Sequence, residues 1–238
     1  MLYRKMIELK SVWKKYSTND VLRRSLREDL SQLFTGKWDE HLSEDEFWAL
    51  SDLSFVVNEG ECLGLYGPNG SGKSTILKLI ASVTYPTMGE VKAGGRVAPL
   101  ISVGAGFHHD LTGRENIYVN GTIIGMTIKE LDSKIKDIIE FSEIERKFLN
   151  MPIRKYSSGM CIRLGFSIAI HSSAEILLMD EVLAVGDEGF RIKSLNKVEE
   201  LKKHKTMIFV THNREMMEKI ADRIIYLDHG KIVKEAVT

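Results

Sequence analysis

The sequence predicts an α/β protein with a mostly parallel core sheet, an antiparallel part near its N-terminus and an inserted block of helices. Three observations favour this fold class. Short, wholly apolar runs at residues 176–179 and 207–210 are typical of strands that are buried on both faces. Helical patterns alternate with these runs, as the crossovers of a parallel sheet require. A glycine-rich loop at residues 67–72 leads from a strand directly into a helix.

The first third of the chain predicts three strands. Residues 6–12 alternate between apolar and polar side chains, which is the period of a strand with one buried face. Residues 50–57 and 61–66 predict two more strands, and the turn residues at 58–60 separate them. We expect the antiparallel pairing to gather here.

The rest of the chain continues the α/β pattern around a long helical block. The expected elements are, in order, a helix over 73–81, a strand over 90–101 broken at Gly94-Gly95, helices over 111–163 with breaks near 126–127 and 151–152, and a strand over 223–227. We therefore expect a single domain over 1–238 that contains a helical subdomain at about 108–165.

Composition narrows the class of protein. The chain has 238 residues, of which 43% are hydrophobic, enough for one large core. Its 33 basic and 33 acidic side chains balance, so no nucleic-acid partner is expected from net charge. Two cysteines make neither a disulfide framework nor a metal cluster, which fits a reducing cytosol. No apolar run reaches the roughly 18–20 residues of a membrane span, so work at a membrane would need an embedded partner.

The sharpest motif is a phosphate-binding loop. Residues 67–75 read Gly-Pro-Asn-Gly-Ser-Gly-Lys-Ser-Thr and match G-x-x-x-x-G-K-[ST] between a strand and a helix. Glycines let backbone N–H groups curl around phosphate, and the helix N-terminus adds its positive dipole end. The pattern predicts a P-loop NTPase with ATP and Mg²⁺ as cofactors. The expected nucleotide-binding residues are Gly67, Asn69, Gly70, Ser71, Gly72, Lys73, Ser74 and Thr75, with Lys73 on the phosphates and Ser74 on the metal.

Two acids follow the buried strand at residues 176–179. Ligands of open α/β sheets bind beyond the carboxyl ends of the strands, so acids there have a reason to exist. Asp180 is expected to hold Mg²⁺, and Glu181 to act as general base on the attacking water. His212 follows the next apolar run and is expected near the γ-phosphate. The alternative, solvated acids that open a loop, is weaker because a P-loop stands in the same chain.

In this order the elements resemble the nucleotide-binding domain of ABC transporters over nearly the whole chain, which implies a RecA-like core. Tyr16 matches the aromatic residue that stacks on adenine in that family. Residues 156–160, Tyr-Ser-Ser-Gly-Met, stand at the position of the signature motif. The resemblance implies a homodimer that sandwiches two ATP molecules, in which Ser157, Ser158, Gly159 and the loop acid Asp187 reach the second copy's nucleotide.

The departures from the family pattern concern glutamine. The usual signature is Leu-Ser-Gly-Gly-Gln, of which only Ser157 and Gly159 remain, and the only glutamine in the chain is Gln32. The family's glutamine-containing loop corresponds to residues 102–109, which also lack it. Which group replaces that amide is left open. His108 and His109 stand there, but adjacent loop histidines are usually solvated.

Four segments resemble a subgroup of these ATPases, the exporters of O-antigen, capsule and teichoic acid. They are residues 104–108, 111–117, 156–160 and 181–187. The resemblance implies ATP-driven export of a lipid-linked polysaccharide through an integral membrane subunit, with this chain bound peripherally at the cytoplasmic face of the inner membrane. The alternatives are an ATPase for lipid, drug or ion transport, or a non-transport ABC ATPase. The sugar, and any C-terminal carbohydrate-recognition domain, stay open.

The stretch over 17–47 is longer than a turn between two strands needs. Leucines 22, 26, 30 and 33 fall on one helical face beside arginines 23, 24 and 27, so a helical insertion is expected, and residues 43–46 look like a capping box. The helix either packs on its own domain or lies at the membrane surface or the membrane subunit. The sequence leaves both roles open.

Overall fold

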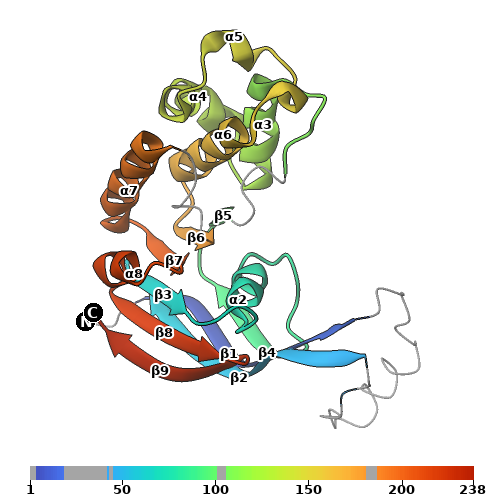
Figure 1. Ribbon diagram of the computed structural model, residues 1–238, viewed down its shortest axis with the longest axis vertical. Coiled ribbons are helices and arrows are strands. Elements are labelled where there is room, and N and C mark those ends of the chain that lie inside the picture. Colours follow the sequence, from blue (N-terminus) through green and yellow to red (C-terminus); the bar gives the residue numbers. More distant parts are fainter. Residues whose placement is uncertain (1–3, 19–41, 43–44, 101–105, 181–186) are drawn as a thin grey trace.

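The computed structural model describes residues 4–18, 42, 45–100, 106–180 and 187–238. Within these ranges the strands form two sheets, a six-stranded sheet in the order β5-β6-β7-β3-β8-β9 and a three-stranded sheet in the order β2-β1-β4 (Figure 1). The six-stranded sheet is parallel from β5 to β8 and antiparallel only at β9. The predicted fold class is confirmed, including the antiparallel part that the N-terminal strands build.

The three-stranded sheet consists of β1 (Lys5–Ser17), β2 (Glu46–Asn58) and β4 (Met88–Ala93), paired antiparallel. The first two strands extend well past the predicted ranges 6–12 and 50–57. Cross-strand pairs explain the extension, because the Trp13 and Trp48 rings lie 5.2 Å apart edge to face.

This extension changes the expected insertion over 17–47 at both ends. Ser17 is the last residue of β1, and Glu46 and Phe47 belong to β2. The predicted capping box at 43–46 is therefore wrong, since Glu46 is in a strand. The helix expected within residues 21–34 lies outside the described residues.

The strands of the core sheet are β3 (Cys62–Tyr66), β5 (Val97–Leu100), β6 (Ile176–Asp180), β7 (Thr206–Val210), β8 (Arg223–Asp228) and β9 (Lys231–Val237). The break at Gly94-Gly95 separates β4 from β5, which lie in different sheets. β7 lies between β6 and β3, so the segments that leave these three strands begin side by side. The edge strand β9 was not predicted.

Alternation along β3 separates two cores. Leu63 and Leu65 face helix α2 (Lys73–Ile80) and the three-stranded sheet, whereas Cys62 faces α8 (Arg214–Ile220) with α7 (Glu188–Lys202) on the same side. The core sheet is thus covered on both faces, as parallel strands require.

The helical block is a separate lobe above the core sheet in Figure 1. It contains α3 (Gly113–Ile123), α4 (Ile128–Ser142), α5 (Arg146–Leu149), a 3₁₀ turn over Ile153–Lys155, and α6 (Ser158–His171). The lobe has its own buried cluster, which includes Ile117, Leu131, Ile138 and Leu164. The breaks near 126–127 and 151–152 fall where the sequence predicts them, whereas the break at 143–145 was not predicted and α6 continues beyond 163. None of the helices in the described ranges has the length and apolar character of a membrane span.

Candidate nucleotide-binding site

The glycine-rich loop connects β3 to α2 in the strand–loop–helix arrangement that the motif requires. Gly70 and Gly72 have φ of 78° and 102°, a region that side chains with a Cβ rarely adopt. A Cβ on Gly72 would also lie 2.5 Å from Leu50 Cδ2. Both glycines therefore bend the loop back over the N-terminus of α2, whose dipole favours an anion.

Lys73 is buried at the start of α2 and points into this loop. Only 7% of the residue is exposed, and its Nζ donates to the carbonyl oxygens of Gly67 (2.7 Å) and Pro68 (2.8 Å). A buried ammonium needs such acceptors, because an unpaired charge away from water is costly. The cation is held inside the ring of backbone that would surround a phosphate.

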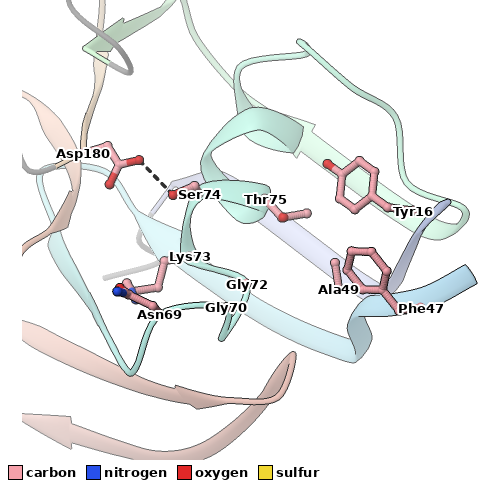
Figure 2. A pocket seen from close by; sticks show the side chains of 10 residues that line it. All are labelled: Tyr16, Phe47, Ala49, Asn69, Gly70, Gly72, Lys73, Ser74, Thr75 and Asp180. Carbon is pink, nitrogen blue, oxygen red and sulfur yellow. Dashed lines mark hydrogen bonds between the residues drawn. The ribbon is translucent and has the colours of Figure 1, made fainter. Parts of the chain in front are cut away.

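Ser74, the next residue, contacts the carboxylate at the end of β6. Its Oγ donates to Asp180 Oδ2 at 2.9 Å, which Figure 2 shows as a dashed line. A hydroxyl and a carboxylate oxygen this close are the hard oxygen donors that Mg²⁺ prefers, and Mg²⁺ commonly completes its shell with water and phosphate. These two side chains fit a magnesium site. Glu181, the predicted general base, lies outside the described residues.

A cavity of about 260 Å³ extends from the loop to two aromatic rings (Figure 2). Its lining residues are Tyr16, Phe47, Ala49, Asn69, Gly70, Gly72, Lys73, Ser74, Thr75 and Asp180. The cavity is therefore polar and cationic at one end and aromatic at the other. That division suits a ligand with phosphates at one end and a flat ring at the other.

The aromatic end joins two strands. Tyr16 on β1 pairs with Phe47 on β2, and the two ring centroids lie 6.1 Å apart with planes inclined by 39°. Phe47 is 47% exposed, which is unusual for phenylalanine, and Lys14 Nζ lies 5.0 Å from the Tyr16 ring centroid. Phe47 and Ala49 were missed by the sequence reasoning. Only the register of β1 against β2 reveals them, since Phe47 is 31 positions from Tyr16.

Two of the predicted P-loop residues, Gly67 and Ser71, do not line the cavity but pack behind it. A Cβ on Gly67 would lie 2.2 Å from the Leu227 carbonyl oxygen, so the loop enters directly against β8. Ser71 is 1% exposed, and its Oγ has no hydrogen-bond partner within the described part of the chain. The backbone carbonyl of Ser71 accepts from the amide of Gly230 in the turn between β8 and β9.

His212 is exposed and follows Thr211 just after β7. Because β7 lies between β6 and β3, this histidine leaves the sheet between Asp180 and the P-loop. His212 is not among the described residues that line the cavity. Its position at this edge of the sheet is the one that the sequence predicts.

The residues of the signature position lie in the helical lobe. Ser157 caps α6, and its Oγ accepts from the Met160 amide at 3.2 Å. Ser158 is exposed, and Gly159 follows it in the first turn. None of the three lines the cavity of its own chain. The structure thus separates them from the P-loop, with the start of α6 exposed.

Asp187 joins two helices. Its Oδ1 accepts from the Phe190 amide at 2.9 Å and so caps α7, while Arg163 of α6 lies 3.4 Å from Oδ2. The Phe190 amide, together with the Arg163 charge, lowers the pKa of this carboxyl. Sequence reasoning missed Arg163, because nothing along the chain indicates its pairing with Asp187.

The segment 111–117 has a structural explanation. Thr112 and Glu115 form a reciprocal capping box at the start of α3. Asn116 is fully buried, accepts from the His108 amide and donates to three carbonyls of the preceding loop. His108 and His109 are exposed and do not line the cavity. Residues 101–105 of the same loop lie outside the described residues.

Comparison with known proteins also points to an ATP-binding protein. The family model of the ABC transporter matches residues 50–184. The chain is 47% identical over 188 residues to the O-antigen export system ATP-binding protein RfbB of Klebsiella pneumoniae, covering 79% of this chain and 76% of that protein. It is 46% identical over 187 residues to the teichoic acids export ATP-binding protein TagH of Enterococcus faecalis, covering 78% of this chain and 41% of that protein.

Solved structures agree at the level of the fold. The ATP-binding cassette MJ0796, in a dimeric post-hydrolysis state bound to ADP and phosphate, aligns with a TM-score of 0.76 at 23% identity over 98% of both chains. The matched family segment runs from β2 through the P-loop and the signature position to Ala184, and it covers more than half of the chain. This chain therefore belongs to the ABC transporter family.

Proposed function

We propose that this chain binds and hydrolyses ATP to drive export of a cell-surface polysaccharide, as the ATP-binding subunit of an ABC exporter. The observation that carries the ATPase function is the cavity that unites Lys73, Ser74 and Asp180 with the ring of Tyr16. The relatives named for O-antigen and teichoic acid export support the polysaccharide class.

Within one subunit, each group of the cavity has a separate task. Tyr16 and Phe47 provide the aromatic surface on which the base stacks, and Lys73 binds the β- and γ-phosphates. Ser74 and Asp180 would hold Mg²⁺, which when bound supplies positive charge to the phosphates. Glu181, next in sequence to Asp180, takes a proton from the attacking water, and His212 contacts the γ-phosphate.

The second subunit completes the site in this proposal. Ser157 and Ser158 are exposed at the start of α6, and Gly159 leaves that helix end open for phosphate. Together with Asp187 they would meet the nucleotide of the partner copy. A dimer closed by two ATP molecules would then open after hydrolysis and move an integral membrane subunit that carries lipid-linked polysaccharide. The chain would act peripherally at the cytoplasmic face of the inner membrane.

Glu181→Gln tests the hydrolysis step. We expect the variant to bind ATP normally and to accumulate as a dimer, with phosphate release roughly 10²–10⁴-fold slower because the general base is lost. Glu188→Gln, an exposed acid in the first turn of α7, is the matched control and should hydrolyse at the native rate. Native turnover by Glu181→Gln would reject that residue as the base.

Export itself needs the membrane partner. We expect the chain to co-purify with an integral membrane subunit, and polymer to reach the cell surface only when both are present and Lys73 is intact. Transport of a lipid, drug or ion with no effect on surface polymer would reject the polysaccharide class while leaving the ATPase function standing.

The stretch between β1 and β2 has a proposed role in export. We propose a helix there, within a single domain, that contacts the membrane surface or the membrane subunit through its arginines. Replacing Arg23, Arg24 and Arg27 together with Ser should reduce export and leave ATP hydrolysis unchanged. Unchanged export with unchanged hydrolysis would reject the contact.

A further inference from the structure

A second cavity lies on the face of the core sheet opposite α2. Its volume is about 240 Å³, and its lining residues are Tyr66, Arg214, Met217, Ile224, Tyr226 and Lys234. None of these residues lines the nucleotide cavity. The two cavities nevertheless share β3, because Tyr66 ends that strand immediately before Gly67.

The floor of this second cavity is a row across three adjacent strands. Tyr66 of β3 is paired with Tyr226 of β8, and Tyr226 is paired with Lys234 of β9. The two tyrosine rings meet edge to face with centroids 5.7 Å apart, and Lys234 Nζ lies 5.6 Å from the Tyr226 centroid. Register therefore fixes two phenols and one ammonium side by side on one face of the sheet.

Helix α8 and the start of β8 supply the remaining walls. Met217 is 1% exposed and Ile224 is 2% exposed, so the interior surface is apolar. Arg214 lies at the rim, where its Nε donates to Glu218 at 2.8 Å. Lys234 makes no ion pair with any of the described residues. The cation on the sheet side is thus available to an anion, while the arginine is already paired.

Size and chemistry define the ligand. A volume of 240 Å³ corresponds to roughly eight water molecules at about 30 Å³ each, below the range of drug-sized pockets. Tyrosine edges and an apolar floor favour a flat ring, and ammonium beside a phenol favours one negative charge. A nucleoside triphosphate carries more negative charge than the ammonium of Lys234 alone can balance.

We propose that this cavity is a second binding site, for a single-ring aromatic acid that carries one carboxylate. The ring lies against Tyr66, Tyr226 and Met217, and the anionic group pairs with Lys234. The site is separate from nucleotide binding.

Titration of the intact protein with 4-hydroxyphenylacetate, followed by saturation-transfer NMR, tests this site. We expect saturable binding at millimolar concentrations that persists in saturating ADP. The neutral isostere 4-hydroxyphenylacetamide should bind at least fivefold more weakly. Lys234→Met should weaken binding of the acid by a similar factor, whereas Lys231→Met, an exposed lysine on the same strand outside the cavity, should leave it unchanged.

Four outcomes would overturn the proposal. They are no saturable binding, equal binding of acid and amide, equal loss in both lysine variants, and displacement of the acid by ADP. The last would assign the acid to the P-loop. Because binding of the acid is measured without turnover, a failure here is distinct from a loss of ATP hydrolysis.

Discussion

The hydroxyl of Ser74 donates to the carboxylate of Asp180 over 2.9 Å, although 106 positions separate the two residues. Sheet order explains the contact, because β7 pairs with both β6 and β3 in parallel and so places the end of β6 near the end of β3, from which the P-loop leads to Ser74 in α2. The contact brings the first turn of α2 and the end of β6 to the same place.

Lys73→Ala should abolish retention of ATP by the purified protein. The ammonium is the one side-chain cation that lines the cavity in the described part of the chain, and a charge-assisted contact to phosphate contributes about 1.5–3 kcal/mol. We expect the dissociation constant to rise at least tenfold, measured by equilibrium dialysis. Lys78→Ala, an exposed lysine of the same helix, is the control. Unchanged affinity in Lys73→Ala would contradict the proposed ATPase function.

Phe47→Ala and Tyr16→Ala should each weaken ATP binding without slowing hydrolysis of bound ATP. Base stacking on an aromatic ring contributes about 1–3 kcal/mol, or roughly five- to 150-fold in affinity. Single-turnover kinetics separates the two effects. Tyr85→Ala removes an aromatic ring that is 77% exposed and lies outside the cavity, so its affinity should not change. Equal affinity for ATP in Phe47→Ala would exclude Phe47 from the base site.

Gly230→Ala should destabilise the fold by about 2–4 kcal/mol. The residue has φ of 74°, and a Cβ there would lie 2.6 Å from the Ala49 carbonyl oxygen. Gly60 is the matched control, since its φ is 76° but nothing lies within 4 Å of the added Cβ. Gly60→Ala should cost only the conformational term of about 1–2 kcal/mol. If the urea unfolding curves of the two variants coincide, the backbone near Ala49 moves away from the added Cβ without a loss in the free energy of unfolding.

Glu130 should contribute stability that disappears in acid. Burial raises its pKa, but hydrogen bonds from Ser173 and the nearby Lys134 outweigh burial and lower the pKa from 4.5 to about 2. The folded pKa is below the unfolded pKa, so the contribution is complete above pH 4.5 and is lost as pH falls toward 2. Glu130→Gln should cost about 1–3 kcal/mol in free energy of unfolding at neutral pH.

The same difference should shrink when both proteins are unfolded in urea below pH 4.5. Glu140→Gln, an exposed acid on the same helix, should match the native protein at every pH. A difference for Glu130→Gln that stays constant from neutral pH into acid would show that its carboxylate charge is not what stabilises the fold.

Local patterns predicted most of the fold and the phosphate end of the site. The P-loop residues adjoin one another in sequence, and Asp180 directly follows an apolar run, so each could be found without knowing which strands pair. Phe47 could not be found this way, because its place beside Tyr16 depends on the β1–β2 register across an insertion. Arg163 and Asp187 are likewise brought together by the packing of α6 near α7. The boundaries of β1 and β2 were predicted too short for a related reason. Cross-strand aromatic pairs extend these two strands, and such pairs cannot be recognised from the alternation of apolar and polar residues along one strand.

Gly230 has a consequence for selectivity. Its amide donates to the Ser71 carbonyl in the P-loop, and its carbonyl accepts from the Ser51 amide on β2, the strand that carries Phe47. Gly230 thus links β2 to the P-loop through two backbone hydrogen bonds. These bonds fix the distance between the aromatic end and the phosphate end of the cavity. The site should therefore select a ligand by the distance between its heterocycle and its phosphates, as well as by the chemistry of the two groups.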